Sequence, residues 1–339
     1  MLKKVALLGG LISIISVVLV FFFSPNFIAV GSVMGLPGGI KDMEVQGDFV
    51  YICDESLTII DASDISSPYV YKIIDMLNPQ WISYQEGFLF LQEGDGNLQI
   101  VDVNDPYNPK VINILSQGGT VALQEGVLYA IRSPNTMKSG ELAVYNFSTP
   151  QDPLLVSERS AIISWSKDFK IKDGYGYIVG GPALLTIISL NNPRNISIAS
   201  TFFDTGIGRH AGQSIKIYGD VAFITDFFDT FNEDSFEYSY NLYAINISNP
   251  LVPEIIWKID SRDIEKVWMD SDLLYCTSHN DGFFIYDISD FLHPSLIYTY
   301  TPPISFIDAV EVHGNYVYLL GGIMGLNRLL ILDKASLIN

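Results

Sequence analysis

The chain has 339 residues, of which 48% are hydrophobic, so it is long and apolar enough to bury a large core. Its 38 acidic residues outnumber 19 basic residues, which gives a net charge of −19. Binding of phosphate groups needs clustered Lys and Arg, so this excess excludes nucleic acid as a partner. It indicates a soluble, self-repelling surface, with cation binding as the alternative.

The N-terminus starts with two lysines, Lys3 and Lys4, and continues with an uncharged apolar run from Val5 to Phe23. This run is longer than the apolar region of a signal peptide and has the length of a membrane span. The preceding lysines predict a cytoplasmic N-terminus. We therefore expect residues 1–24 to be an uncleaved transmembrane signal anchor in the cell membrane, with the rest of the chain outside. The alternative is a signal peptide cleaved after Gly31.

From residue 25 onward, the sequence repeats a pattern of short strands. The second strand of each repeat has an aromatic residue at one equivalent position: Tyr51, Phe90, Tyr129, Tyr177, Phe223, Tyr275 and Tyr318. A period of about 40–50 residues that contains only strands is typical of a β-propeller, with one four-stranded blade per repeat. The sequence therefore predicts an all-β domain over residues 25–339, a seven-bladed β-propeller of four-stranded antiparallel blades.

Two turns recur in each predicted blade. The first strand ends in a two-residue hairpin such as Glu86-Gly87, whose residues tolerate positive φ. The third strand is aliphatic and ends in a short polar residue, which we expect to accept hydrogen bonds from the following turn. These residues are Asp61, Asp102, Asn146, Ser189, Asn246, Asp287 and Asp333.

The third strands carry a family resemblance. Leu98-Gln-Ile-Val-Asp102 and Leu57-Thr-Ile-Ile-Asp61 resemble the LVIVD-repeat family of bacterial and archaeal surface or envelope propellers. The resemblance covers residues from about 25 to 339 and departs most in the fourth repeat, where Ser189 replaces the acid. It implies the propeller fold and no particular activity.

The last repeat stops after the strand Leu329–Leu332 and lacks a fourth strand of its own. The segment Pro25–Val30 matches the proline and apolar strand that begin the fourth strand elsewhere. We therefore expect Phe27–Val30 to pair with Leu329–Leu332 and to close the ring. Cleavage after Gly31 would remove most of that strand and leave a sheet edge unpaired, which favours the uncleaved anchor.

The connections differ between the two faces of the predicted disc. Hairpins between strands one and two, and turns between strands three and four, are nearly constant and define a uniform face. The other connections vary in length and define an elaborated face, where we expect binding residues. The candidate binding residues there are Arg209, His210, Asp226, Asp229, Asn232, Asp234, His279 and Asp281.

The segment between residues 225 and 240 is the most acidic of the predicted loops. Carboxylates such as Asp226, Asp229 and Asp234 suit Ca²⁺, although their spacing matches no EF-hand. A Ca²⁺ site and a solvated acidic loop are the two interpretations. No other cofactor is predicted.

The first strand of each blade should line the central channel. Its polar positions predict four acids and three bases around the channel, accompanied by Trp81 and Trp268, with Trp165 just before this phase. The charged residues are Asp42, Glu44, Asp168, Glu311, Lys170, Lys216 and Lys266. They either surround a small polar ligand or pair with one another, and the tryptophans either stack on a sugar or fill gaps between blades.

Two further expectations concern single residues. Cys53 and Cys276 lie in different blades and differ in register, so we expect two buried thiols and no disulfide. Asn195-Ile-Ser is a possible glycosylation acceptor that the repeat does not explain. The matching motifs at Asn146 and Asn246 occupy the turn position described above.

The sequence has no Gly-x-Ser-x-Gly, P-loop or dinucleotide motif. We therefore expect a membrane-anchored, extracytoplasmic, non-catalytic module that binds a surface protein or glycan. One alternative is an extracytoplasmic enzyme with its site at the channel mouth, using Arg209, His210 and the acids of 226–234. Another is a structural subunit of an envelope assembly, which a flat apolar patch on the outer blade edges would indicate.

Overall fold

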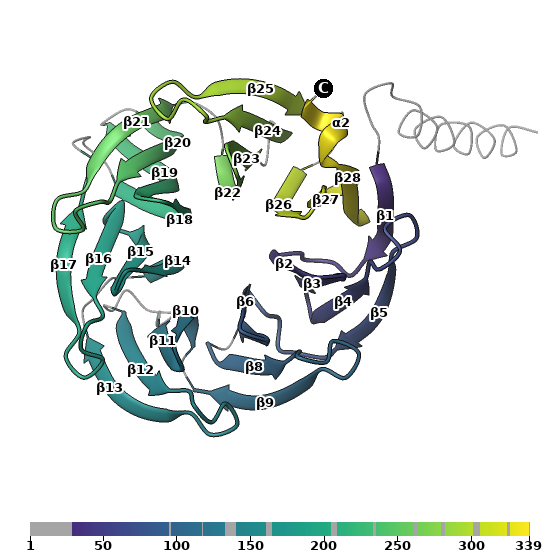
Figure 1. The fold of residues 1–339 in the computed structure, drawn as a ribbon, viewed down its shortest axis with the longest axis horizontal. Helices are drawn as coiled ribbons and strands as arrows, with labels where there is room; N and C mark the ends of the chain where they lie inside the picture. The colour runs from purple at the N-terminus through teal and green to yellow at the C-terminus, as the bar shows by residue number, and fades with distance from the viewer. Residues whose placement is uncertain are drawn as a thin grey trace, which may run out of the picture.

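The computed structural model describes residues 29–94, 96–116, 118–132, 140–160, 165–204, 209–232, 235–260, 264–278, 282–300, 306–323 and 326–338. These residues form seven four-stranded antiparallel sheets arranged as the blades of a ring (Figure 1). The predicted all-β, seven-bladed propeller is thus confirmed. The predicted anchor at residues 1–24 lies outside the described residues, and within them no helix is long and apolar enough to cross a membrane.

The strands of each blade follow one another from the centre of the ring outward. Blade 1 consists of β2 (Asp42–Gln46), β3 (Phe49–Cys53), β4 (Leu57–Asp61) and β5 (Tyr69–Ile74). Blade 2 consists of β6 (Trp81–Gln85), β7 (Phe88–Gln92), β8 (Leu98–Asp102) and β9 (Lys110–Leu115). Blade 3 consists of β10 (Gly119–Gln124), β11 (Val127–Arg132), β12 (Glu141–Asn146) and β13 (Leu154–Ser160).

Blades 4 to 6 repeat this order. Blade 4 consists of β14 (Trp165–Lys172), β15 (Tyr175–Gly181), β16 (Leu185–Ser189) and β17 (Ser197–Phe202). Blade 5 consists of β18 (Arg209–Tyr218), β19 (Val221–Asn232), β20 (Ser235–Asn246) and β21 (Glu254–Asp260). Blade 6 consists of β22 (Ile264–Asp270), β23 (Leu273–Ser278), β24 (Gly282–Asp287) and β25 (Ser295–Tyr300).

Blade 7 joins the two ends of the chain. It consists of β26 (Phe306–His313), β27 (Tyr316–Ile323), β28 (Leu326–Asp333) and β1 (Ala29–Leu36), followed by the short helix α2 (Lys334–Ile338). Strand β1 pairs antiparallel with β28, with Ala29 opposite Leu332 and Val33 opposite Leu329. The predicted closure by the N-terminal segment is therefore confirmed.

The closing strand extends further along the sequence than predicted. The prediction placed it at 27–30, whereas β1 continues to Leu36, opposite Asn327. A chain that began after Gly31 would keep Ser32–Leu36 in the sheet. The argument that cleavage after Gly31 would remove most of the strand was therefore wrong.

In the described part of the chain, the core consists of seven apolar clusters, one at each interface between neighbouring blades. The repeated aromatic residue explains this arrangement, because it packs against the next blade. Tyr51 lies in the cluster between blades 1 and 2, and Tyr318 in the cluster that joins blade 7 to blade 1. The aromatic period read from the sequence thus marks the interfaces that hold the ring together.

The uniform face is as regular as predicted. Two residues connect the first and second strands of every blade, and seven residues connect the third and fourth strands of blades 1 to 6, as in 62–68 and 288–294. The polar residue that ends the third strand accepts a hydrogen bond from the backbone two positions later, as Ser63 N–H donates to Asp61 Oδ1 (2.9 Å). The same bond is formed by Asp102, Asn146, Asn246, Asp287 and Asp333.

The predicted acidic loop between residues 225 and 240 is instead an extended β-hairpin. Strands β19 and β20 pair from Val221 opposite Asn246 to Asn232 opposite Ser235. Alternating aromatic residues such as Phe227, which packs edge-on against Tyr240, favour strand over loop here. The interpretation as a solvated loop was wrong for the described part of this segment.

The closing strand gives a test of ring stability. Gly31 is buried against blade 1, and a Cβ atom there would clash with the backbone carbonyl oxygen of Ile65. We expect Gly31→Ala to lower the free energy of unfolding by about 1–3 kcal/mol, because the turn of blade 1 must shift. Urea denaturation monitored by circular dichroism measures this change. The neighbouring Ser32 is exposed, so Ser32→Ala should change stability by less than about 0.5 kcal/mol. Equal effects of both substitutions would contradict the packing of β1 on blade 1.

Candidate functional site

The innermost strands bring two rings of side chains to the centre of the propeller. The first ring holds the residue opposite the repeated aromatic in each blade: Glu44, Ser83, Ala122, Lys170, Lys216, Trp268 and Glu311. The second ring lies two residues earlier and holds Asp42, Trp81, Thr120, Asp168, Ser214, Lys266 and Ala309. Positions two apart on a strand share a face, so both rings point the same way.

Two adjoining cavities occupy the channel. The ring cavity has a volume of about 50 Å³ and is lined by residues of both rings. The hairpin-side cavity has a volume of about 310 Å³ and extends past Tyr84 and Gln85, toward the hairpins of the uniform face. Glu44, Lys216 and Trp268 line both cavities. The channel therefore has room for a small molecule in contact with buried charges.

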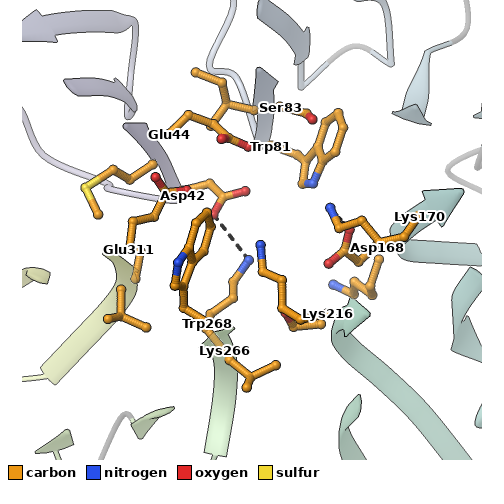
Figure 2. Close-up of a pocket in the computed structure, with 17 residues that line it drawn as sticks. Asp42, Glu44, Trp81, Ser83, Asp168, Lys170, Lys216, Lys266, Trp268 and Glu311 are labelled. Carbon is orange, nitrogen blue, oxygen red and sulfur yellow. Dashed lines mark hydrogen bonds and ion pairs between the residues drawn. The ribbon is translucent and has the colours of Figure 1, made fainter. Parts of the chain in front are cut away.

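The predicted channel residues do gather in the ring cavity (Figure 2). All four acids and three lysines line it, together with Trp81 and Trp268. Two of the lysines form ion pairs: Lys170 Nζ lies 3.0 Å from Asp168 Oδ1, and Lys266 Nζ lies 3.3 Å from Asp42 Oδ1. The third, Lys216, lies over the Trp268 ring with its Nζ 3.8 Å from the ring centre.

Several polar side chains of the rings also bind the backbone of the next blade. An innermost strand has one edge without a strand partner, so its N–H groups there need acceptors. Glu311 Oε2 accepts from Val45 N–H (2.5 Å), and Asp168 Oδ2 accepts from Ile215 N–H (3.0 Å). Glu44 accepts from Tyr84 N–H in the same way. This structural role was not predicted, because the sequence does not show which N–H groups lack a strand partner.

Burial shifts the pKa values of two acids upward. Burial, opposed by attraction to Lys216 and Lys170, raises the pKa of Glu44 to about 7. Burial and repulsion from Glu44 raise the pKa of Glu311 well above its usual value. The two side chains come from the adjacent blades 1 and 7. Together they form a wall of buried carboxyl groups that are costly to ionise.

The pKa values of two channel lysines shift in opposite directions. Burial and repulsion from Lys170 lower the pKa of Lys216. Burial also acts on Lys170, but Asp168 and Glu44 outweigh it and raise its pKa. The difference follows from pairing, since Lys170 has a carboxylate partner and Lys216 has an aromatic ring.

A further cation, Lys167, lines the ring cavity and was missed by the sequence analysis. Strand β14 shifts register between Ser166 and Asp168, and this bulge changes the direction of the residue between them. Burial and repulsion from Lys266 lower the pKa of Lys167. Strict alternation along the strand, on which the prediction was based, does not anticipate a bulge.

The residues predicted on the elaborated face are not those that line the two cavities. Arg209 is the cross-strand partner of Asp229, and His210 that of Phe228, so β18 and β19 bring Arg209 and Asp229 together. Asp226 is fully buried opposite Asn241, and Asn232 ends β19. Asp234, His279 and Asp281 lie outside the described residues.

The Ca²⁺ site stays a prediction. In the described ranges, no three His, Cys, Asp or Glu side chains gather as metal ligands would. Positions 226 and 229 are three positions apart on β19, and positions an odd number apart on a strand lie on opposite faces of the sheet. The hairpin geometry therefore does not favour a shared ion at these two positions.

The remaining single-residue expectations have mixed outcomes. Cys53 and Cys276 are both buried and unbridged, as predicted, and belong to clusters at separate blade interfaces. Asn195 is exposed in a turn of the uniform face, and its glycosylation stays a prediction.

Comparison with known proteins agrees with the repeat assignment. The LVIVD repeat model matches residues 37–75, 80–115 and 261–302, which contain blades 1, 2 and 6. No curated protein matches the sequence. The protein is thus a seven-bladed β-propeller with four-stranded blades, and it carries LVIVD repeats.

Solved structures resemble this chain along most of its length. It is similar to the WD40 β-propeller domain of Doa1, with 12% identity over 91% of this chain and 98% of that chain, and a TM-score of 0.63. A chain of the mitotic checkpoint complex covers 91% of this chain and 95% of its own length, with 10% identity and a TM-score of 0.67. A hypothetical selenium-binding protein from Sulfolobus tokodaii shows 12% identity over 88% of this chain and 90% of that chain, with a TM-score of 0.60. At these identities the likeness concerns the fold alone.

The raised pKa of Glu44 makes stability depend on pH. Glu44 loses its proton near pH 4.5 in the unfolded chain and near pH 7 in the folded chain. The free energy of unfolding should therefore fall as the pH rises from 4.5 to 7, and it should level off above pH 7. Glu44→Gln keeps an acceptor for Tyr84 N–H and removes this part of the fall. Relative to the wild type, we expect the free energy of unfolding of the variant to rise by about 1–2 kcal/mol between pH 5 and pH 8. The rise is smaller than the full pKa shift would give, because channel water screens part of the effect.

Urea midpoints at pH 5, 6, 7 and 8 measure this gain. Glu55→Gln is the matched control, because Glu55 is exposed outside the channel. A residual fall should remain in Glu44→Gln, since Glu311 is shifted in the same direction. Parallel pH curves for the wild type and Glu44→Gln would contradict the assignment.

Proposed function

We propose that this protein is a non-catalytic binding module whose ligand enters the central channel. The observation that carries the proposal is the ring cavity, in which buried charges and two tryptophans from different blades face one space. Each side chain is held by a strand of a rigid blade, which keeps the site preformed. The ligand is a small polar solute or the polar end of a larger molecule, and it contacts Glu44, Lys216 and Trp268.

Binding is favoured over catalysis by the arrangement of the polar groups. Asp168 and Glu311 are hydrogen-bonded to backbone N–H groups of the next blade, and Asp42 is paired with Lys266. Such groups fix geometry and orient a ligand. The pKa of Glu44 near 7 is the one observation that favours the enzyme alternative, since a general acid or base works best near the ambient pH.

We further propose that the apolar N-terminal run displays the propeller outside the cell membrane. Strand β1 begins beside the C-terminal end of β28, with Ala29 opposite Leu332, and that end of β28 lies at the uniform face. The chain therefore enters β1 at the uniform face. In this orientation the uniform face lies next to the membrane and the elaborated face points away from it. A surface protein or glycan is the partner we expect on that outer side.

The channel site can be tested by equilibrium dialysis of the solubilised full-length protein against mixtures of small solutes and oligosaccharides. We expect mass spectrometry to detect enrichment of one class of solute. Trp81→Ala should abolish the enrichment, because Trp81 lines the ring cavity. Tyr71→Ala is the control, since Tyr71 lies on the outer strand β5. Enrichment that persists in Trp81→Ala would exclude the channel, and chemical conversion that stops in Glu44→Gln would favour the enzyme alternative.

The orientation gives a labelling prediction for intact membranes. Asp64 lies in a turn of the uniform face, and Asn232 lies at the end of β19 on the opposite side of the disc. Single cysteines in a Cys53→Ser, Cys276→Ser background should react with a bulky maleimide quickly at position 232 and slowly at position 64. Detergent should equalise the two rates. Faster labelling at position 64 in membranes would reverse the orientation.

The second candidate, a structural subunit of an envelope assembly, would use the outer strands of the blades as its contact surface. Exposed apolar side chains occur on the outer strands of blades 1 to 6: Tyr69, Val70, Ile73, Val111, Ile114, Leu154, Leu155, Ile198, Ile255, Leu296 and Ile297. They are distributed around the ring and do not gather on one blade, so no single docking face stands out. Chemical cross-linking in membranes tests this role, and recovery of the protein as an uncross-linked monomer would count against it.

A further inference from the structure

Some charged side chains of the channel form ion pairs with one another, and others do not. Asp168 with Lys170 and Asp42 with Lys266 form two ion pairs. Among the described residues, Glu44, Glu311 and Lys216 form no ion pair. Glu44 and Glu311 each accept one backbone N–H, and Lys216 contacts the face of Trp268. Lys167, which also lines the ring cavity, forms no ion pair among the described residues either. The channel therefore holds two carboxyl groups and two ammonium groups, those of Lys216 and Lys167, without an ion-pair partner.

These unmatched groups lie on different sides of the ring. Glu44 and Glu311 come from the neighbouring strands β2 and β26, whereas Lys216 comes from β18, three blades away from blade 1. Figure 2 shows Glu44 and Glu311 on the side of the cavity opposite Lys170, the lysine next to Lys216 in the first ring. The channel thus has a carboxyl wall and an ammonium wall.

A space separates the two walls. Glu44 and Lys216 each shift the pKa of the other, so their charges lie near enough to interact. They are nevertheless too far apart to form an ion pair, and both line the ring cavity and the hairpin-side cavity. A ligand in this space can contact both walls at once.

We propose that the ligand of this channel is a small zwitterion, a molecule of amino-acid size that carries one ammonium and one carboxylate group. Its ammonium group binds Glu44 and Glu311, and its carboxylate binds Lys216. This inference rests on the proposed function, because it names the ligand class of the channel site. Trp81 and Trp268 supply the apolar surfaces beside the charged contacts.

Other ligand classes match the channel less well. A simple amine or carboxylate satisfies one wall and leaves the other buried and unmatched, which is costly. A neutral sugar satisfies neither wall. A divalent cation would gain Glu44 and Glu311 but would be repelled by Lys170 and Lys216, which line the same cavity.

The test uses the full-length protein and a series of ligands with increasing charge separation: glycine, β-alanine and γ-aminobutyrate. Ethylamine, propionate and glucose are the singly charged and neutral comparisons. We expect one zwitterion of the series to raise the melting temperature by a few degrees at saturating concentration, because it binds only the folded state. Ethylamine and propionate together should not reproduce this rise. Titration calorimetry then gives the dissociation constant.

Two substitutions test the walls separately, each with a matched control. We expect Lys216→Met and Glu44→Gln to weaken binding of that zwitterion at least tenfold. Lys172→Met and Glu55→Gln should leave it unchanged, because neither residue lines the channel cavities. If Lys216→Met does not fold, Glu44→Gln alone decides, since it keeps the hydrogen bond from Tyr84.

The outcomes separate this inference from the proposed function. The zwitterion inference would be overturned if glucose, ethylamine alone or propionate alone bound as tightly as the best zwitterion. The channel would then still be a binding site. Binding of the zwitterion that neither channel substitution weakens would overturn both. Failure of all three zwitterions to bind at millimolar concentration would overturn the inference, and the dialysis experiment would then decide the proposed function.

Discussion

Pairing of β1 with β28 is the constraint on which the rest of this propeller depends. A blade buries both of its apolar faces only when it packs against a neighbour on each side. An open row of seven blades would therefore leave one apolar face exposed to water at each end. The cluster between blades 7 and 1 contains Val33 and Leu36 of β1 together with Leu329 and Ile331 of β28. One strand therefore completes a sheet and covers an interface at the same time. With it in place, all seven interfaces are equivalent and the innermost strands surround a channel.

The channel follows from the same geometry. Seven innermost strands each present one edge without a strand partner to the centre, and the side chains that satisfy these edges are polar. Glu311 binds the backbone of blade 1 and Asp168 that of blade 5. Polar groups are thus required near the axis for structural reasons alone, and a binding site can use those that remain unmatched. This explains how a buried, highly charged centre is compatible with a stable fold.

Much of this arrangement could be predicted from the sequence, because it depends on simple periods. The aromatic repeat located the blades, and the period of two along each first strand located Glu44, Lys216 and the other channel residues. The backbone hydrogen bonds of Glu311 and Asp168 could not be predicted, since they depend on the offset between neighbouring blades. The bulge at Lys167 was missed for a related reason, because strict alternation fails at an extra residue.

The segment 225–240 illustrates a different limit. Its acids suggested a loop, yet its aromatic residues pair across two strands, as Phe227 does with Tyr240. Cross-strand contacts between residues distant in sequence outweigh the low strand propensity of Asp and Asn. Four of the candidate binding residues on the elaborated face, Asp226, Asp229, Asn232 and Asp234, rested on this loop assignment. The channel residues rested on strand periodicity and were found where that periodicity placed them.

Closure by the N-terminal strand also has a consequence for biosynthesis. Strand β1 is made before all the other strands of the ring, whereas its partner β28 is made after all of them. Each of blades 1 to 6 consists of consecutive strands and can form as the chain grows, whereas blade 7 waits for a pairing between residues about 300 positions apart. Until then the apolar edge of β28 is open to other chains. If β1 pairs slowly with β28, newly made molecules should therefore associate with one another through β28 while their other six blades are already folded.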